Sequence, residues 1–159
     1  MLQLIFSIAL LSISNFSVAE QLSLSESSIS TGNENAPYQV NVFTTATCPA
    51  CKHLFAQSEI YNDKFNFIWR PVLADSYSDQ AFLSIFNSKD IKETFINFMD
   101  YGFLPDSKPV YVPAIGLNSR FMQQLGFTGT PSGVVVSSNG DSYSYQGLNQ
   151  LFDILDNLP

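Results

Sequence analysis

The pattern of apolar and polar positions predicts two strands in the first half of the chain. One is the β-branched, apolar run over Gln39 to Thr45, and the other is the run F-N-F-I-W-R-P-V over Phe65 to Val72. Pro71 near the end of the second run indicates an edge strand or the point where the strand ends. A helix is expected between the two strands, after Cys48, and its inward side would carry Leu54, Phe55 and Ile60.

Helical spacing follows the second strand. Asp79 is expected to cap a helix that begins before A-F-L-S-I-F, and Lys89 to Met99 repeats apolar residues with the period of a second helix. Together these two segments predict a helical insertion. The stretch from Tyr101 to Pro113 is rich in proline and predicts a loop, after which Asn118 is expected to cap a short helix ending near Gly126.

The C-terminal part predicts a hairpin and a closing helix. Val134 to Ser137 and Ser142 to Gln146 read as strands on either side of Asn139-Gly140, a pair of residues typical of a tight turn. The closing helix is amphipathic, with apolar positions Leu148, Leu151, Phe152, Leu155 and Leu158.

The N-terminal region predicts export. Residues 2–11 are apolar apart from Gln3 and Ser7, and the small residues Ser17 and Ala19 fit a signal-peptidase site. The apolar run is shorter than the roughly 20 residues that a membrane-spanning helix needs. We therefore expect a signal peptide over 1–19, a polar leader or linker over 20–36 that stays outside the core, and one domain over 37–159.

Composition limits the classes of partner. The chain has 159 residues, of which 45% are hydrophobic and 14% aromatic, so a single domain can build its core without disulfide staples. Fourteen acidic residues against seven Lys and Arg give a net charge of -7. That charge argues against nucleic acid and against an anionic membrane surface as partners.

The candidate chemistry lies in the only two cysteines, Cys48 and Cys51. An apolar strand before them and a helix after them would place the pair in the first turn of the helix. There, free N–H groups and the helix dipole favour a thiolate, and can lower a cysteine pKa from about 8.5 to roughly 3.5–7.5. A thiolate is the species that attacks disulfides. Pro49 suits a first helical turn and Ala50 is small and uncharged, so these two residues are expected to tune the pair.

Zinc binding, haem attachment and a static disulfide are the alternatives to redox chemistry for the two cysteines. Structural zinc needs about four ligands, whereas the chain has two cysteines and one histidine, His53. Covalent haem attachment requires histidine directly after the second cysteine, where this chain has Lys52. No metal or cofactor is therefore expected. A static disulfide stays open, although so short a loop would remove little entropy from the unfolded chain. His53 is expected to be a solvated helix residue, and Lys52 to add local positive charge.

A second motif, Gly129-Thr130-Pro131, precedes the Val134 strand. Its position after the insertion matches the place where thioredoxin-fold proteins carry a cis proline, and the element order is that of a thioredoxin fold. A cis bond at Pro131 would leave the backbone of Thr130 available to pair with an extended substrate strand. An ordinary trans proline is the alternative. The fold class expected from both motifs is α/β, thioredoxin-like, with a helical insertion.

From Tyr38 to the C-terminus the chain resembles the catalytic domain of the bacterial periplasmic disulfide isomerases DsbC and DsbG. The resemblance rests on V-N-V-F-T-T-A-T-C-P-A-C, the insertion, and L-G-F-T-G-T-P-S followed by V-V-V-S-S-N-G. It implies a periplasmic protein in which Cys48 is the exposed nucleophile, Cys51 is the resolving thiol, and Thr130 with Pro131 binds substrate. Val42 occupies the position at which thioredoxin has a buried acidic residue, which also favours the isomerases.

Two departures from the isomerases affect the expected function. The polar leader leaves no room for their N-terminal dimerisation domain, so a monomer or a narrower set of clients is expected. Pro49-Ala50 also differs from the family's residues between the cysteines.

The leading hypothesis is disulfide isomerisation or reduction on exported proteins with cysteines, together with a membrane electron donor or acceptor. The alternatives are a non-enzymatic assembly or peptide-binding factor, with Tyr101, Phe103 and Tyr111 as contacts, and a thiol reductase for cytochrome maturation.

Overall fold

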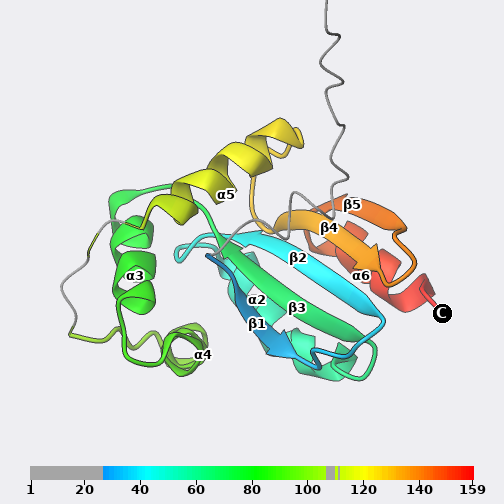
Figure 1. Cartoon of the computed structure of the whole chain (residues 1–159), viewed down its shortest axis with the longest axis horizontal. Helices are drawn as coiled ribbons and strands as arrows, with labels where there is room; N and C mark the ends of the chain where they lie inside the picture. Colours follow the sequence, from blue (N-terminus) through cyan, green and yellow to red (C-terminus); the bar gives the residue numbers. More distant parts are fainter. Residues whose placement is uncertain (1–26, 107–109, 111) are drawn as a thin grey trace, which may run out of the picture.

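A five-stranded sheet forms the centre of the molecule. The structure is a computed structural model that describes residues 27–106, 110 and 112–159. The strands are β1 (Ile29–Gly32), β2 (Tyr38–Thr44), β3 (Phe65–Pro71), β4 (Ser132–Ser137) and β5 (Ser142–Gln146). Their order across the sheet is β1-β3-β2-β4-β5 (Figure 1). Strands β2 and β3 run parallel, and the other neighbouring pairs are antiparallel. The predicted signal peptide lies outside the described residues.

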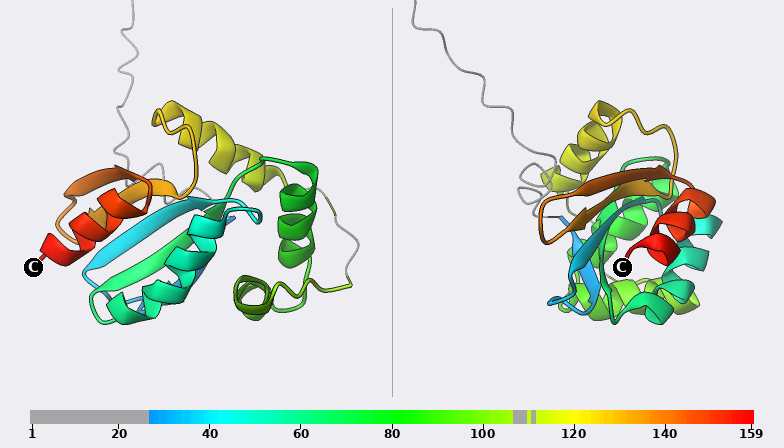
Figure 2. Two further views of the ribbon diagram at one scale, coloured as in Figure 1. Left: turned by 180° about the vertical axis from the view of Figure 1, so that it is seen from behind. Right: turned by 90° about the vertical axis from the view of Figure 1, so that its right-hand side faces the viewer.

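The helices connect and cover the strands (Figure 2). They are α2 (Pro49–Ser58), the short 3-10 helix η1 (Glu59–Tyr61), α3 (Ser76–Phe86), α4 (Ile91–Tyr101), α5 (Pro113–Gln124) and α6 (Leu148–Asn157). Helix α2 is the crossover between the parallel strands β2 and β3, and α3, α4 and α5 lie between β3 and β4 in the sequence. Within the described residues, no helix combines the length and the apolar character needed to cross a membrane.

Apolar side chains fill both sides of the sheet. The larger cluster joins Val40 and Trp69 of the sheet to Leu54 of α2, Phe95 of α4 and Leu151 of α6. The smaller cluster contains Phe43 and Val134, whose side chains point to the opposite face of the sheet and pack against α5. The sheet therefore fixes the C-terminal end of β2, where the two cysteines follow, between two packed layers.

Most of the predicted elements are confirmed within two residues. This holds for β2, β3, β4 and β5, for the helix between β2 and β3, and for α4 and α6. The hairpin turn is also confirmed: Gly140 has a φ of 94°, a left-handed conformation that glycine adopts without steric cost, and its N–H donates to the carbonyl of Ser137. Short, strongly patterned strands and turns are the features that local sequence specifies best.

The expectation that residues 20–36 stay outside the core is wrong for the segment from Ser27 to Gly32. Ile29 is 3% exposed and belongs to the main core, and β1 pairs with β3 over four residues. The indole N–H of Trp69 also donates to the hydroxyl of Thr31 at 2.9 Å. This pairing places β3 inside the sheet, so Pro71 marks the end of the strand and not an edge.

The starts of two helices also differ from the prediction. Asp75, not Asp79, is the N-cap of α3, while Asp79 accepts the Ala74 N–H from within the first turn. Helix α5 begins at Pro113, so Asn118 lies in its middle, 1% exposed. There its amide nitrogen donates to the carbonyl of Ser27 at 2.8 Å and to that of Pro71 at 3.0 Å. Tertiary hydrogen bonds, and not capping, account for this asparagine.

The expectation that Ile60 faces inward is also wrong. Leu54 is fully buried as predicted, but Ile60 is 72% exposed. The reason is that α2 ends at Ser58 and the chain continues as the tighter helix η1, which changes the direction in which the next side chains point.

Candidate redox site at the start of helix α2

Cys48 and Cys51 lie at the N-terminus of α2 and are joined by a disulfide. Cys48 is the N-cap residue, and its sulfur accepts the N–H of Cys51 at 3.0 Å. Cys48 retains 8% of its surface exposed, whereas Cys51 has none. An attacking molecule can therefore reach Cys48 and not Cys51, which is the asymmetry that a nucleophile and a resolving thiol require.

The surroundings of Cys48 favour negative charge on its sulfur. The first turn of α2 contains no acidic residue, and its free N–H groups and dipole point toward the cap position. Pro49 occupies the first helical position, where its missing N–H costs no hydrogen bond. The Lys52 ammonium lies 5.1 Å from the centre of the Phe98 ring, and His53 is exposed as predicted.

The predicted cis proline is confirmed, and it lies opposite Cys48. The Thr130–Pro131 peptide bond is cis. The carbonyl oxygen of Thr130 is 3.4 Å from the sulfur of Cys48. In the disulfide that sulfur carries no proton, so the pair is a contact, whereas in the reduced chain the Cys48 thiol can donate to the same oxygen. The hydroxyls of Thr45 and Thr130 lie 3.5 Å apart beside it.

The cis-proline loop is held by the junction between β5 and α6. The N–H of Gly147 donates to the carbonyl of Pro131 at 2.8 Å. The side chain of Gln146 accepts the N–H of Thr128 at 3.2 Å and donates to the Thr128 hydroxyl at 3.4 Å. Sequence reasoning did not identify Gln146 or Gly147, because their partners are 16 or more positions away in the chain.

The loop before Cys48 is held by the start of α3. The N–H of Ala46 donates to the hydroxyl of Ser78 at 2.7 Å, and the hydroxyl of Thr47 donates to the carboxylate of Asp75 at 2.8 Å. The pKa of Asp75 is lowered from 3.8, first by the Ser78 N–H and then by the Thr47 hydroxyl, with the Tyr77 N–H adding to them. Sequence reasoning did not identify Asp75, although an aspartate just before a helix is a residue type that favours capping; nothing local indicated its bond to Thr47.

A groove of about 560 Å³ begins at the cis-proline loop. It runs between that loop, the segment after β3 and the C-terminal part of α5. All of its lining residues are uncharged: Thr45, Val72, Leu73, Ala74, Ser119, Met122, Gln123, Phe127, Thr128, Gly129 and Thr130. The groove therefore offers apolar surface and neutral hydrogen-bonding groups next to Cys48.

The sheet beneath the site contains a buried cation. Arg70 is 3% exposed, and its Nε donates to the side-chain oxygen of Asn41 at 2.9 Å. Burial lowers the pKa of Arg70 to about 10, so it is charged at neutral pH. Val42 is fully buried and apolar. Among the described residues, the His, Cys, Asp and Glu side chains form no group of three that could hold a metal ion.

Comparisons with known proteins identify the fold. No protein-family model and no curated protein matches the chain. Among solved structures, the disulfide interchange protein from Neisseria gonorrhoeae has a TM-score of 0.62 at 22% identity, covering 81% of this chain and 93% of that chain. A periplasmic thioredoxin-like protein from Salmonella enterica serovar Typhimurium has a TM-score of 0.57 at 18% identity, covering 81% and 88%. This chain has a thioredoxin-like fold.

The helical insertion is part of the same likeness. The catalytic domain of Proteus mirabilis ScsC has a TM-score of 0.62 at 20% identity, over 87% of this chain and 92% of that one. The predicted fold class, α/β and thioredoxin-like with a helical insertion, is therefore confirmed. None of these three structures is named as DsbC or DsbG, and the resemblance to those isomerases stays a prediction.

Proposed function

We propose that this chain is a thiol:disulfide oxidoreductase that acts on exported, cysteine-containing proteins. The observation that carries the proposal is the Cys48–Cys51 disulfide at the N-terminus of α2, with its accessible sulfur facing the cis Thr130–Pro131 bond. The likeness to a disulfide interchange protein supports the same class of chemistry.

The reaction proceeds by two exchanges. The Cys48 thiolate attacks one sulfur of a substrate disulfide, forms a Cys48–substrate disulfide and releases the other substrate sulfur as a thiolate. The buried Cys51, as thiolate, then attacks Cys48, which reforms the Cys48–Cys51 disulfide and releases the first substrate sulfur. The substrate gains two electrons and the chain loses two. If a substrate thiolate resolves the mixed disulfide instead, the substrate is isomerised without net electron transfer.

The cis-proline loop and the groove would hold the substrate chain during this exchange. An extended segment that pairs with the backbone of Thr130 would place its cysteine at Cys48. The segment beyond that cysteine would lie in the uncharged groove. Clients with apolar or neutral residues beside the attacked cysteine therefore suit the site better than clients with charged ones.

The direction of electron flow identifies the partner. Isomerisation or reduction requires a membrane electron donor that returns Cys48 and Cys51 to thiols, and oxidation requires a membrane acceptor. We favour isomerase or reductase action in the periplasm, with neither metal nor organic cofactor. Because the helix terminus stabilises the thiolate of Cys48, the disulfide is expected to accept electrons from such a donor readily, which suits isomerase action better than reduction of clients.

The test is exchange on a scrambled, disulfide-containing protein. Cys48→Ser should abolish exchange, whereas Cys51→Ala should accumulate a Cys48–substrate disulfide that is visible by mass spectrometry under non-reducing conditions. His53→Ala, an exposed residue of the same helix, is the matched control and should retain activity. Full exchange by Cys48→Ser would show that the nucleophile has been assigned incorrectly.

The reduction potential of the pair separates the finer alternatives. A value around -120 to -200 mV indicates an oxidase or isomerase, and a value near -270 mV indicates a reductase such as the one proposed for cytochrome maturation. A value below about -300 mV indicates a static bridge.

A non-enzymatic assembly factor is the second candidate, favoured by an exposed apolar surface at the C-terminal end of α4 and in the loop that follows. Tyr101 and Phe103 are 70% and 71% exposed, with ring centres 6.2 Å apart, and Val110 is 60% exposed. Tyr111, the third predicted contact, lies outside the described residues. Client maturation that a Cys48→Ala, Cys51→Ala double variant supports as well as wild type would favour this function over exchange.

A further inference from the structure

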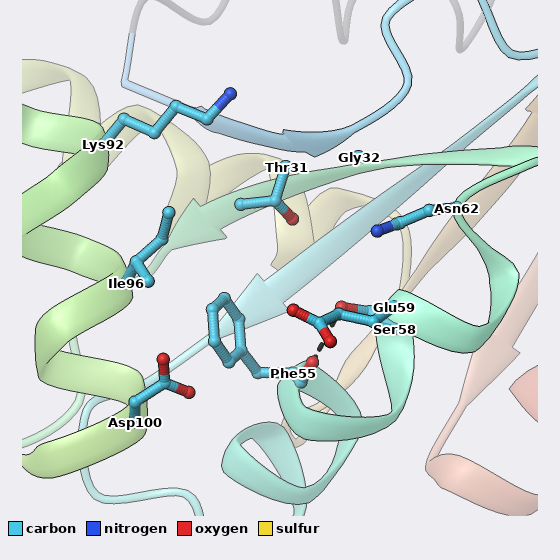
Figure 3. A pocket seen from close by; sticks show the side chains of 9 residues that line it. All are labelled: Thr31, Gly32, Phe55, Ser58, Glu59, Asn62, Lys92, Ile96 and Asp100. Atoms are coloured by element: carbon cyan, nitrogen blue, oxygen red, sulfur yellow. Dashed lines mark hydrogen bonds between the residues drawn. The ribbon is translucent and has the colours of Figure 1, made fainter.

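The two edges of the sheet are protected to different extents. Helix α4 lies beside β1, and a pocket of about 170 Å³ separates Thr31 and Gly32 from Lys92, Ile96 and Asp100 (Figure 3). At the opposite edge, no described helix or strand lies beyond β5 (Figures 1 and 2). An open edge strand is a template on which another strand can pair.

Two hydrogen bonds establish which backbone groups of β5 face outward. The N–H of Ser137 donates to the carbonyl of Asp141, so Asp141 points its bonding groups toward β4. The N–H of Gln146 donates to the side chain of Gln150 at 2.8 Å and not to β4. Bonding direction alternates along an antiparallel strand, so Ser142, Ser144 and Gln146 point outward. Because Gln150 caps Gln146, the open stretch is centred on Ser142 and Ser144.

This open stretch is complementary to itself. In an antiparallel pair related by a two-fold axis at Tyr143, Ser142 of one copy would face Ser144 of the other. Each such pair exchanges two backbone hydrogen bonds, and symmetry makes four in all. Tyr143, which is 38% exposed, would face its own counterpart, and aromatic side chains opposite each other stabilise antiparallel strands.

Charge and helix position do not oppose this pairing locally. Residues 142–152 contain no charged side chain, so the edge lacks the lysines and acids that usually prevent strand pairing. Helix α6 is held toward the interior of the sheet: the Tyr61 hydroxyl donates to Asp156 at 3.0 Å, and the rings of Tyr61 and Phe152 stack. The helix therefore packs beneath the sheet, next to η1, and leaves the outer edge of β5 uncovered.

We propose that β5 is a dimerisation edge, on which a second copy of this chain pairs antiparallel to form a continuous ten-stranded sheet. A second copy is favoured over an unfolded client because its strand is already ordered, so pairing costs less conformational entropy. The interaction is independent of the chemistry at Cys48. Because the pairing is antiparallel, the two Cys48–Cys51 sites would lie toward opposite ends of the joined sheet.

The experiment is sedimentation velocity of residues 20–159, the chain expected after removal of the signal peptide. Wild type and variants with substitutions in β5 are compared over a concentration series. Wild type should show a weight-average mass that rises from one chain toward two. Since each copy carries a net charge of -7, added salt should strengthen the association. Ser144→Pro removes a donor that β4 does not use, so it should keep the melting temperature while weakening the dimer about tenfold or more.

Two variants of opposite charge at one position test the register of the paired strands and whether the second strand comes from another copy of this chain. Tyr143→Lys alone and Tyr143→Glu alone should each stay monomeric, whereas an equal mixture should form heterodimers, because residue 143 faces itself across the axis. Asn149→Lys, an exposed position on α6, is the matched control and should dimerise like wild type. Exchange activity per site should be unchanged in Ser144→Pro.

Three outcomes would overturn the proposal. The first is a wild-type mass that stays at one chain up to about 1 mM, the weakest association of interest. The second is a dimer that Ser144→Pro leaves intact, or that the mixture of charged variants does not restore. The third is binding of an unfolded, reduced client that Ser144→Pro abolishes while wild type stays monomeric, since the edge would then receive a client strand.

Discussion

Replacing Gly133 with alanine tests the closest backbone approach in the sheet. Gly133 of β4 pairs with Tyr145 of β5, and the Tyr145 side chain extends past it so that its hydroxyl donates to the carbonyl of Asn41 in β2 at 3.0 Å. A Cβ at position 133 would overlap that carbonyl oxygen and lie 2.9 Å from the Tyr145 hydroxyl. Because the overlapping atom belongs to the backbone of a central strand, no rotation of a neighbouring side chain can make room for the added methyl group.

The expected cost has two parts. Inserting a methyl group into a packed core costs about 1–3 kcal/mol, and separating Tyr145 from Asn41 leaves two buried polar groups unpaired, which costs about 1–3 kcal/mol more. Burial raises the pKa of Tyr145 well above its usual value, so the hydroxyl keeps its proton and acts as a donor at neutral pH. Gly133→Ala should therefore lose roughly 2–6 kcal/mol, or about 6–30 °C in Tm for a domain of this size.

Thermal and urea unfolding of the oxidised chain measure this loss. Tyr145→Phe isolates the hydrogen-bond part and should lose about 1–3 kcal/mol. Gly129→Ala is the matched control, because a Cβ added at position 129 would have no atom within 4 Å and the φ of Gly129 is not positive. A Gly133→Ala variant that melts within about 2 °C of Gly129→Ala would refute the reasoning, since it would mean that β2 and β4 separate at little cost.

Two further predictions concern contacts far apart in the sequence. The lowered pKa of Asp75 means that its ionised form stabilises the fold above the unfolded-state pKa of 3.8, and that this contribution is lost as the pH falls through the folded-state value. The difference in Tm between wild type and Asp75→Asn should thus stay constant above about pH 5 and shrink in acid; a difference that grows in acid would contradict the assignment. Asn118→Ala should lose about 2–4 kcal/mol and speed hydrogen exchange in β1, because the carbonyls of Ser27 and Pro71 lose a donor. Unchanged exchange in β1 would mean that this side chain does not hold the N-terminal strand.

Local pattern was sufficient for the parts of the fold that short-range physics determines. The strand before Cys48, the Asn139-Gly140 turn and the amphipathic helix α6 each depend on neighbours within a few residues. The cis bond at Pro131 is an exception, because it was predicted only by combining two motifs that are about 80 positions apart. The cysteine pair defined the fold well enough for the second motif to be interpreted.

The features that sequence reasoning missed depend on distant partners. Strand β1 is short and polar, I-S-T-G, and only pairing with β3 and burial of Ile29 stabilise it as a strand. Asp75 and Asp79 both stand near the start of α3, and local propensity does not distinguish which one caps it. Asparagine is a residue type that is common at helix caps, but Asn118 lies inside the helix, where its buried amide donates to the carbonyls of Ser27 and Pro71.

The helical insertion contributes to the candidate site as well as covering the sheet. The N-cap of α2 is Cys48 itself. The N-cap of α3 is Asp75, which accepts a hydrogen bond from the hydroxyl of Thr47, the residue directly before Cys48. The Ala46 N–H is fixed by Ser78 in the same turn of α3. Stabilisation of a thiolate by a helix terminus requires that the sulfur and the N–H groups keep their relative positions, because the effect is confined to the first turn. Helix α3 therefore positions the loop that delivers Cys48, and changes in this helix are expected to alter the redox properties of the pair without contacting either sulfur.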